Sequence, residues 1–394
     1  MTTRSWLTTV LLSGCSFQIS APATGDDGTT IDASSPDGPG IDSSTSIDAP
    51  IDAPIDALCS WALHFDTCSI SSPPAGGVVL TPGAWTFDTD TKLFSPTPAT
   101  NFFVATDTIQ PGGAPAVLLA VETFNAQVGA TLRVVGSKPL IVGSWTTIVV
   151  DGVIDAGSKR GGTSGAGTAM ATCSPNGAGP GVASDAGGGG GGGGFRGAGG
   201  TGGIGDGAAG GTPGAARSVP SFVRAGCPGA SGGLNGFGVG GAGGGALELV
   251  ARTSISINGT VTSGGAGGQG GGQTGFKGGG GGGGSGGLVG IDTPALTLGS
   301  NAVLAANGAG GGGGGNGLAQ PGQDGPGGTG PAAGGSSSAR NGGAGGNGTT
   351  LVGETPMFSG DGGGGAGGGA GFILVRTANL NNQGAVISPS TQPQ

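Results

Sequence analysis

Glycine dominates the chain after residue 150 and constrains the fold more than any other feature of the sequence. Of the 394 residues 102 are glycine, and nearly all of them lie between four copies of a short apolar pattern. The copies read PLIVGSWTTIVVDGVIDAG from Pro139, ALELVARTSISINGTVTSG from Ala246, LVGIDTPALTLGSNAVLAANG from Leu288 and FILVRTANLNNQGAVIS from Phe372. Apolar residues alternate within each copy, which is the period of a β-strand with one buried face.

The copies align in columns of apolar residues, and only Asn382 breaks the pattern. The columns are Leu140, Leu247 and Phe372; Val142, Leu249 and Leu374; Ile148, Ile255 and Leu380; Val150, Ile257 and Asn382; and Ile154, Val261 and Val386, with Leu296, Leu298 and Val303 joining the last three. A single copy cannot bury its own apolar face, whereas stacked copies cover one another. We therefore predict an all-β fold of parallel β-helix or solenoid-like repeats, with long glycine-rich loop insertions at one corner. The alternative is an antiparallel sandwich with long disordered loops.

The glycine tracts themselves admit two states. An isolated tract is a flexible coil, because glycine loses the most conformational entropy when it is ordered. Tracts that a scaffold holds side by side can instead form polyglycine II helices, which satisfy their peptide groups only from neighbouring segments. The sequence leaves both states open. In the solenoid interpretation the strands carry the stability, so deleting residues 267–284 is expected to leave the fold intact.

The charge of the chain is concentrated at its beginning. Residues 1–58 contain eight aspartates against one basic residue, Arg4, and the formal net charge of the whole chain is −9. The rest of the chain is almost uncharged and has no basic stripe, so nucleic acid is not an expected partner. Only 9% of the residues are charged and the one histidine, His64, has no cluster of possible metal ligands around it in the sequence. We predict no cofactor, no metal and no catalytic residues.

The N-terminus carries the most specific local signal. A short apolar stretch follows Arg4 and ends in Leu12, Ser13, Gly14 and Cys15. These four residues resemble the lipobox of bacterial lipoproteins, in which a cysteine is acylated and becomes the first residue of the mature chain. The resemblance implies a signal peptide over residues 1–14 and lipidation of Cys15. Ser16 stands where an aspartate retains members of the family on the inner membrane, so we expect the outer membrane and exposure at the cell surface.

Residues 15–58 are predicted to be a disordered tether. They are rich in Asp, Pro, Ala and Ser, and they end in a repeated Ile-Asp-Ala-Pro pattern from Ile47. Proline at every fourth position disfavours helix and central strand, and the aspartates repel one another. Residues 59–136 contain less regular strand patterns and are expected to form an N-terminal β cap on the glycine-rich body, which covers residues 137–390.

The four remaining cysteines form an even set, which an oxidising compartment allows to pair. They are Cys59, Cys68, Cys173 and Cys227. Of the three possible connectivities we favour Cys59 with Cys68 and Cys173 with Cys227. The first closes a small loop, in which we place His64 as an ordinary loop residue, and the second closes the longest glycine-rich insertion. Metal binding is the competing interpretation.

The glycine-rich part is similar in composition to PE-PGRS-type surface proteins, although the N-terminal PE segment is missing here. That resemblance implies a structural or adhesive role at the cell surface, with the membrane as partner through the lipid and polysaccharide or another surface component as the ligand. The alternative function is a β-helical carbohydrate-active enzyme, in which Asp151 and Asp155 act as acid and base. A further alternative is an ice-binding solenoid displaying Thr260 and Thr262.

Overall fold

The computed structural model describes residues 61–68, 75–168, 173–174, 177–272, 277–316, 319–338, 340–357 and 361–394. The chain divides into two compact units, Met1–Ile51 and Asp52–Gln394, and every described residue belongs to the second. The regular secondary structure of the described residues consists of β-strands, with no α-helix. The predicted signal peptide and tether lie outside the described residues.

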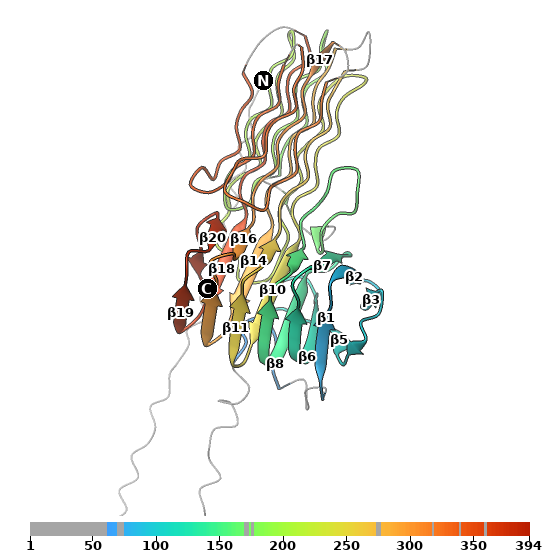
Figure 1. Ribbon diagram of the computed structural model, residues 1–394. Coiled ribbons are helices and arrows are strands. Elements are labelled where there is room, and N and C mark those ends of the chain that lie inside the picture. Colours follow the sequence, from blue (N-terminus) through green and yellow to red (C-terminus); the bar gives the residue numbers. More distant parts are fainter. Residues whose placement is uncertain are drawn as a thin grey trace, which may run out of the picture. The chain divides into compact units, whose positions relative to one another are not determined.

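The larger sheet has 12 strands, most of which run parallel to their neighbours (Figure 1). Its main path is β19-β15-β11-β8-β10-β14-β18-β21, and β6 joins the path at β8. The strands of this sheet are β1 (Gly77–Leu80), β4 (Thr100–Asn101), β5 (Val104–Thr108), β6 (Ala116–Ala126), β8 (Leu140–Val150), β10 (Ala246–Ala251), β11 (Ser254–Ile257), β14 (Leu288–Asp292), β15 (Ala295–Leu298), β18 (Phe372–Arg376), β19 (Asn379–Asn382) and β21 (Gln392–Pro393).

The smaller sheet has 7 strands in the order β20-β16-β12-β9-β7-β2-β3. They are β2 (Gly83–Asp88), β3 (Leu93–Ser95), β7 (Ala130–Val135), β9 (Val153–Asp155), β12 (Thr260–Thr262), β16 (Val303–Ala305) and β20 (Val386–Ser388). A separate antiparallel pair, β13 (Lys277–Gly278) and β17 (Gly315–Asn316), lies within the glycine-rich part. Strands from the predicted 59–136 segment and from the repeats thus belong to the same two sheets.

Each repeat contributes to both sheets, and its alternate apolar residues form one buried core. Leu247 pairs with Leu140, Ile255 with Ile148 and Val261 with Ile154, as the sequence columns predict. These side chains are at most 1% exposed and belong to a single cluster that draws on both sheets. The period of two therefore locates the core correctly in the first two copies.

The alignment is wrong by one residue at three columns of the last copy and at one column of the Leu288 copy, where Leu304 and not Val303 pairs with Val261. Ile373, not Phe372, aligns with Leu247 through Val289, and Ile387, not Val386, aligns with Val261 through Leu304. Leu374 is likewise replaced in its column by Val375. Both faces of β18 are apolar, and Phe372 and Leu374 pack in a second cluster on its outer face. Hydrophobicity alone therefore does not distinguish the two registers.

The prediction of a parallel β-helix with glycine loops at one corner is wrong. The sheets are mixed, because β5 pairs antiparallel with β6, β3 with β2 and β4 with β1. The repeats also do not form closed coils. After β9, β12 and β16 the chain leaves the sheets, runs through long glycine-rich segments and returns at β10, β14 and β18 (Figure 1). The apolar repeats predict the parallel strand stacking between copies, but they carry no information on how the glycine-rich segments connect them.

The glycine-rich segments run side by side and are joined by backbone hydrogen bonds (Figure 1). Along residues 279–286 the amides donate to three neighbouring segments in turn, so each neighbour is met at every third residue. The three series are Gly279 to Gly233, Gly282 to Ala230 and Ser285 to Cys227; Gly280 to Gly363, Gly283 to Ala366 and Gly286 to Gly369; and Gly281 to Gln269 and Gly284 to Ala266. Three residues per turn without internal hydrogen bonds is polyglycine II geometry.

The carbonyl groups of the same segment accept from three further neighbours with the same period. The bonds are Gly238 to Gly279 and Gly241 to Gly282; Gly190 to Gly280 and Gly193 to Gly283; and Gly312 to Gly281 and Ala309 to Gly284. Residues 279–286 therefore lie inside an array in which other segments surround them and satisfy their peptide groups. We call this array, formed by the glycine-rich segments between residues 177 and 371, the glycine lattice.

Close packing explains why the lattice requires glycine. A Cβ atom on Gly281, Gly282 or Gly284 would lie 2.1, 2.0 or 1.9 Å from a carbonyl oxygen of a neighbouring segment. None of these three glycines has a positive φ, so their backbone conformation is open to other residues. Of the two states that the sequence allows, flexible coil or ordered polyglycine II helix, the tracts adopt the ordered one. Glycine is required there because it lets one backbone approach another closely.

Candidate functional site

A buried group of charged side chains lies on the outer face of β10, β14 and β18. Parallel pairing places Val250, Asp292 and Arg376 in one row, and Glu248 lies in the neighbouring row beside Gly290. Alternation explains the placement, because Leu247 and Leu249 point into the core and Glu248 points away from it. Gly290 leaves room for this carboxylate, since a Cβ there would lie 2.9 Å from Cγ of Glu248.

Residues 61–68 cover this face of the sheet. Trp61 and Phe65 pack with Leu118, Ile141 and Leu374 in the outer apolar cluster, and the two aromatic rings meet edge to face at 5.7 Å. The covering segment is what removes the charged side chains from solvent. Glu248 is fully buried and Asp292 is 3% exposed.

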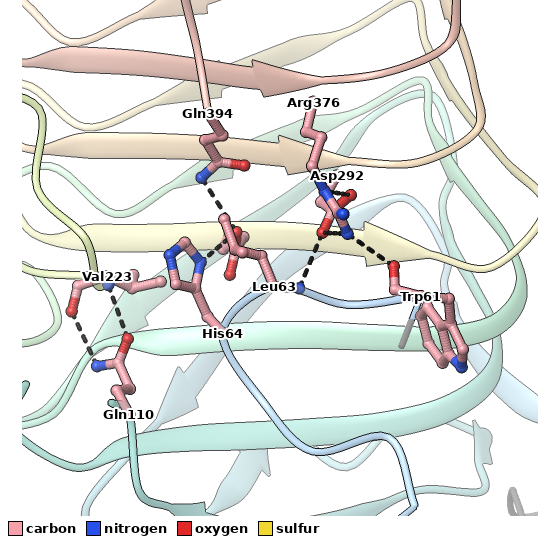
Figure 2. Close-up of polar contacts among 9 residues, drawn as sticks. Trp61, Leu63, His64, Gln110, Val223, Asp292, Arg376 and Gln394 are labelled. Carbon is pink, nitrogen blue, oxygen red and sulfur yellow. Dashed lines mark hydrogen bonds and ion pairs between the residues drawn. The ribbon is translucent and has the colours of Figure 1, made fainter. Parts of the chain in front are cut away.

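His64 and Glu248 form the first contact between the covering segment and the sheet. The Nδ1 atom of His64 lies 2.8 Å from Oε1 of Glu248, and both side chains are buried (Figure 2). The side-chain amide of Gln394 donates to the same oxygen at 3.3 Å. Oε2 of Glu248 is buried without a hydrogen-bond partner among the described residues.

Arg376 and Asp292 form the second contact. The guanidinium of Arg376 donates from Nε to Oδ1 of Asp292 at 2.7 Å and from Nη2 to Oδ2 at 2.6 Å (Figure 2). Nη2 also donates to the carbonyl of Trp61 at 2.9 Å, and the amide of Leu63 donates to Oδ2 at 3.2 Å. The pair thus fixes the backbone of residues 61–63 to β14 and β18.

The two contacts are coupled electrostatically. Burial by itself lowers the pKa of His64, but the hydrogen bond and negative charge of Glu248, together with Asp292, raise that pKa above its ordinary value of 6.5. Burial raises the pKa of Asp292, and Arg376 opposes the shift. With His64 protonated, two carboxylates face two cations. The imidazolium therefore neutralises a buried group that otherwise has an excess negative charge.

This arrangement is suited to holding a segment in place. Every charged member of the group has a protein partner, and the described residues contain no set of three or more His, Cys, Asp or Glu side chains placed to hold a metal ion. A shallow groove of about 460 Å³ opens beside the group, between Trp61 and Thr377. Asp292 borders this groove with both carboxylate oxygens already bonded.

A second groove also uses its carboxylates internally. It has a volume of about 560 Å³ and is bordered by Asp88 and Asp90. Asp90 accepts from the amide of Ser137, and Asp88 accepts from the amide of Asp90 at 2.8 Å. These carboxylates stabilise turns.

The structure gives Asp155 a structural role. Its carboxylate pairs with Arg133 at 3.2 Å and Lys159 at 3.1 Å, and it accepts from the amide of Gly157 at 2.8 Å. Asp151 lies in the turn between β8 and β9. Asp155 therefore has two cationic partners, which favours a structural role for its carboxylate over proton exchange with a substrate.

The structure joins Cys173 to Cys227 in a disulfide, the pair that the sequence analysis favours, with Cα atoms 5.8 Å apart. Cys227 lies in the lattice segment that neighbours Ser285. Cys68 is also disulfide-bonded. Cys59, Cys15 and the lipobox residues Leu12, Ser13 and Gly14 lie outside the described residues.

Sequence reasoning missed the buried charged group and treated His64 as a loop residue. A signal was present, because Glu248 is a lone carboxylate in the apolar run ALELVA, and Asp292 and Arg376 end the runs LVGID and FILVR. A charge inside such a run requires a buried partner. The sequence does not show that this partner lies 184 residues away, at His64.

Comparisons with known proteins give no relative. The chain matches no protein-family model, no curated protein sequence and no solved structure. The described part of the chain also contains no helix with the length and apolar character of a membrane span.

Proposed function

We propose that the chain is a non-enzymatic cell-surface lipoprotein with a structural or adhesive role. The observation that carries the proposal is the glycine lattice, in which the main chain supplies the internal hydrogen bonds of residues 279–286 in every direction. A large part of the chain is thus devoted to an ordered array with almost no side chains inside it. Such an array offers an extended, rigid body, and only its outer residues are available to partners.

The dimensions of the lattice favour a display role. A polyglycine II segment rises about 3.1 Å per residue, so the eight residues 279–286 extend roughly 25 Å. The hydrogen-bonded neighbours hold each segment extended, whereas a free glycine coil of this length is compact and mobile. The lattice is therefore a stiff projection built from a composition that normally gives a flexible linker.

The proposed location is the outer membrane, through a lipid on Cys15 and the acidic tether of residues 15–58. The proposed partners are the membrane, through this lipid, and polysaccharide or another surface component as the ligand. Nucleic acid is not proposed, because the chain has 13 basic against 22 acidic residues and no basic stripe.

The enzyme alternative gains no specific support from the site geometry. The enzyme alternative assumes a β-helix, which the structure does not show. It also assumes that the carboxylates of Asp151 and Asp155 are free to act as acid and base. Asp155 is instead held by Arg133 and Lys159. We therefore keep one proposed function.

Metabolic labelling tests the anchor. In a bacterial host the full chain is expected to incorporate labelled palmitate and to partition into detergent, whereas Cys15→Ala does neither. Cys59→Ala is the matched control, because it removes a cysteine that the lipobox does not contain. Equal labelling of the Cys15→Ala and wild-type chains would exclude lipidation at this residue.

A glycan array combined with a reducing-sugar release assay tests the role of the body. We expect retention on one class of polysaccharide without release of new reducing ends. Release of reducing ends above the rate of a heat-denatured sample would instead identify an enzyme. Absence of retention on every glycan would restrict the proposal to a structural role.

A further inference from the structure

Both sheets end at the last repeat with an open edge. β19 pairs only with β15, and β20 pairs only with β16, among the described strands. The neighbouring strand β18 is different, because β21 covers it through the parallel pairs of Leu374 with Gln392 and Val375 with Pro393. We call β19 and β20 together the terminal edge. It offers unpaired backbone groups in two sheets (Figure 1).

The terminal edge also exposes the end of the apolar core. Leu380 continues the column of Ile255 and Leu296, but it is 57% exposed, whereas each of these is 1% exposed. Ile387 in β20 continues the column of Val261 and Leu304 and is only partly buried. In the interior of the ladder the next strand covers each core residue, and at Leu380 no described strand does so.

Neither β19 nor β20 carries a charged side chain. Residues 377–394 contain no Asp, Glu, Lys or Arg. The opposite end of the sheets carries such charges, because Lys92 precedes β3 and Asp107 lies in β5, where it pairs with Lys92 and Lys138. Charged residues at an edge prevent strands of other chains from adding to it, and the terminal edge lacks them.

We propose that the terminal edge is an association surface for a second copy of this chain, with β19 paired antiparallel to β19 of the copy. An uncharged edge meets its own copy without like-charge repulsion. A two-fold axis also makes the contact self-complementary and closed. The proposal is independent of the surface role proposed above, since it concerns only the two strands and their exposed residues.

The side-chain alternation of β19 restricts the register of this contact. Residues directly opposite each other in a sheet point to the same face, so Leu380 must lie opposite Leu380 or Asn382 of the copy. We place the two-fold axis at Leu380, because leucine then lies opposite leucine, and Asn379 lies opposite Asn381. This register covers the exposed leucine and pairs asparagine with asparagine on the outer face.

Light scattering on the full chain carrying Cys15→Ser tests the association without a contribution from lipid at this position. We expect a dimer mass, and Leu380→Lys is expected to halve this mass because it places a charge at the axis. The matched control is Leu93→Lys on β3, where leucine is 61% exposed at the charged end of the sheets. A monomer mass for the parent chain at about 100 μM, or an unchanged dimer for Leu380→Lys, overturns the proposal.

A cysteine at the axis tests the register. Cα atoms of directly opposite residues in an antiparallel pair lie about 4.5–5.5 Å apart, within the range that a disulfide spans. We therefore expect Leu380→Cys to form a covalent dimer on mild oxidation. Ser300→Cys, in the exposed turn before β16, is the control for random collision. Cross-linking of Leu380→Cys no faster than that of Ser300→Cys excludes the proposed register and, with a monomer mass, the association itself.

Discussion

The β-sheets and the glycine lattice both have buried interiors, but apolar side chains form the interior of the sheets and main chain forms most of the interior of the lattice. In the sheets, side chains such as Ile255 and Leu296 are 1% exposed and form the apolar core. In the lattice, the interior of residues 279–286 consists of main chain and the buried hydroxyl of Ser285, and each amide bonds to a neighbouring segment. The sheets thus lose stability when a core side chain becomes polar, whereas the lattice loses stability when a side chain is added at a closely packed glycine such as Gly282.

The two regions also bury different kinds of polar group, peptide groups in the lattice and charged side chains in the sheets. The lattice buries many peptide groups, and none of its interior glycines can titrate. The sheets bury few polar side chains, and those beneath residues 61–68 are charged. We therefore expect substitutions of glycine to change the stability of the lattice, and a change of pH to change the stability of the sheets beneath residues 61–68.

Ile255→Asp is expected to have the largest effect. The substitution places a carboxylate in the core column between Ile148 and Leu296, where no cation can reach it. We expect a loss of about 4 kcal/mol or more in the free energy of unfolding, measured by denaturant titration. Ser256→Asp is the control, since Ser256 faces outward in the same strand, and it should cost less than about 1 kcal/mol. Equal effects would mean that the apolar columns are not the core of the sheets.

Gly282→Ala is expected to lower the free energy of unfolding by an intermediate amount, although a glycine-to-alanine substitution often raises it. Alanine normally stabilises a compatible glycine position by about 0.4–1 kcal/mol through the unfolded chain. At Gly282 its Cβ would lie 2.0 Å from the carbonyl oxygen of Gly191. We expect a net loss of about 1–3 kcal/mol in thermal unfolding experiments.

Gly328→Ala is the matched control for this test. Gly328 lies in the glycine-rich part without a positive φ, and nothing lies within 4 Å of the position of a Cβ. This variant should be neutral or slightly stabilising. If Gly282→Ala behaves like Gly328→Ala, the tracts are not closely packed and the lattice contributes little to stability.

The apolar repeats could be predicted from the sequence because their information is local. A period of two identifies the buried face, and the spacing of the copies identifies the parallel neighbours, as the pairing of Ile257 with Val150 and Leu298 shows. Where both faces of a strand are apolar, as at Phe372, the same reasoning gives a register wrong by one residue.

The glycine lattice and the charged group could not be predicted in this way. A tract of glycines has no pattern that identifies its neighbours, so the order of residues 279–286 depends on segments that begin or end far along the chain. The expectation that residues 267–284 are dispensable belonged to the incorrect loop interpretation. Their deletion would remove the hydrogen-bond partners of segments on several sides. The contact of His64 with Glu248 likewise depends on how residues 61–68 fold back over the sheet.

His64→Gln is expected to have the smallest effect at neutral pH and to remove a pH dependence. Because the pKa of His64 is raised in the folded chain, its contribution is complete below the ordinary value of 6.5 and is lost as the pH rises through the folded-state pKa. The free energy of unfolding of the wild type should therefore fall as the pH rises above about 6.5. Glutamine can still donate a hydrogen bond to Glu248, so at neutral pH we expect a loss of only about 1 kcal/mol and a flat profile over the same range. Gly282→Ala, whose damage lies in the lattice, should retain the wild-type slope. If His64→Gln keeps that slope, or Gly282→Ala loses it, the division of pH dependence between the two regions is wrong.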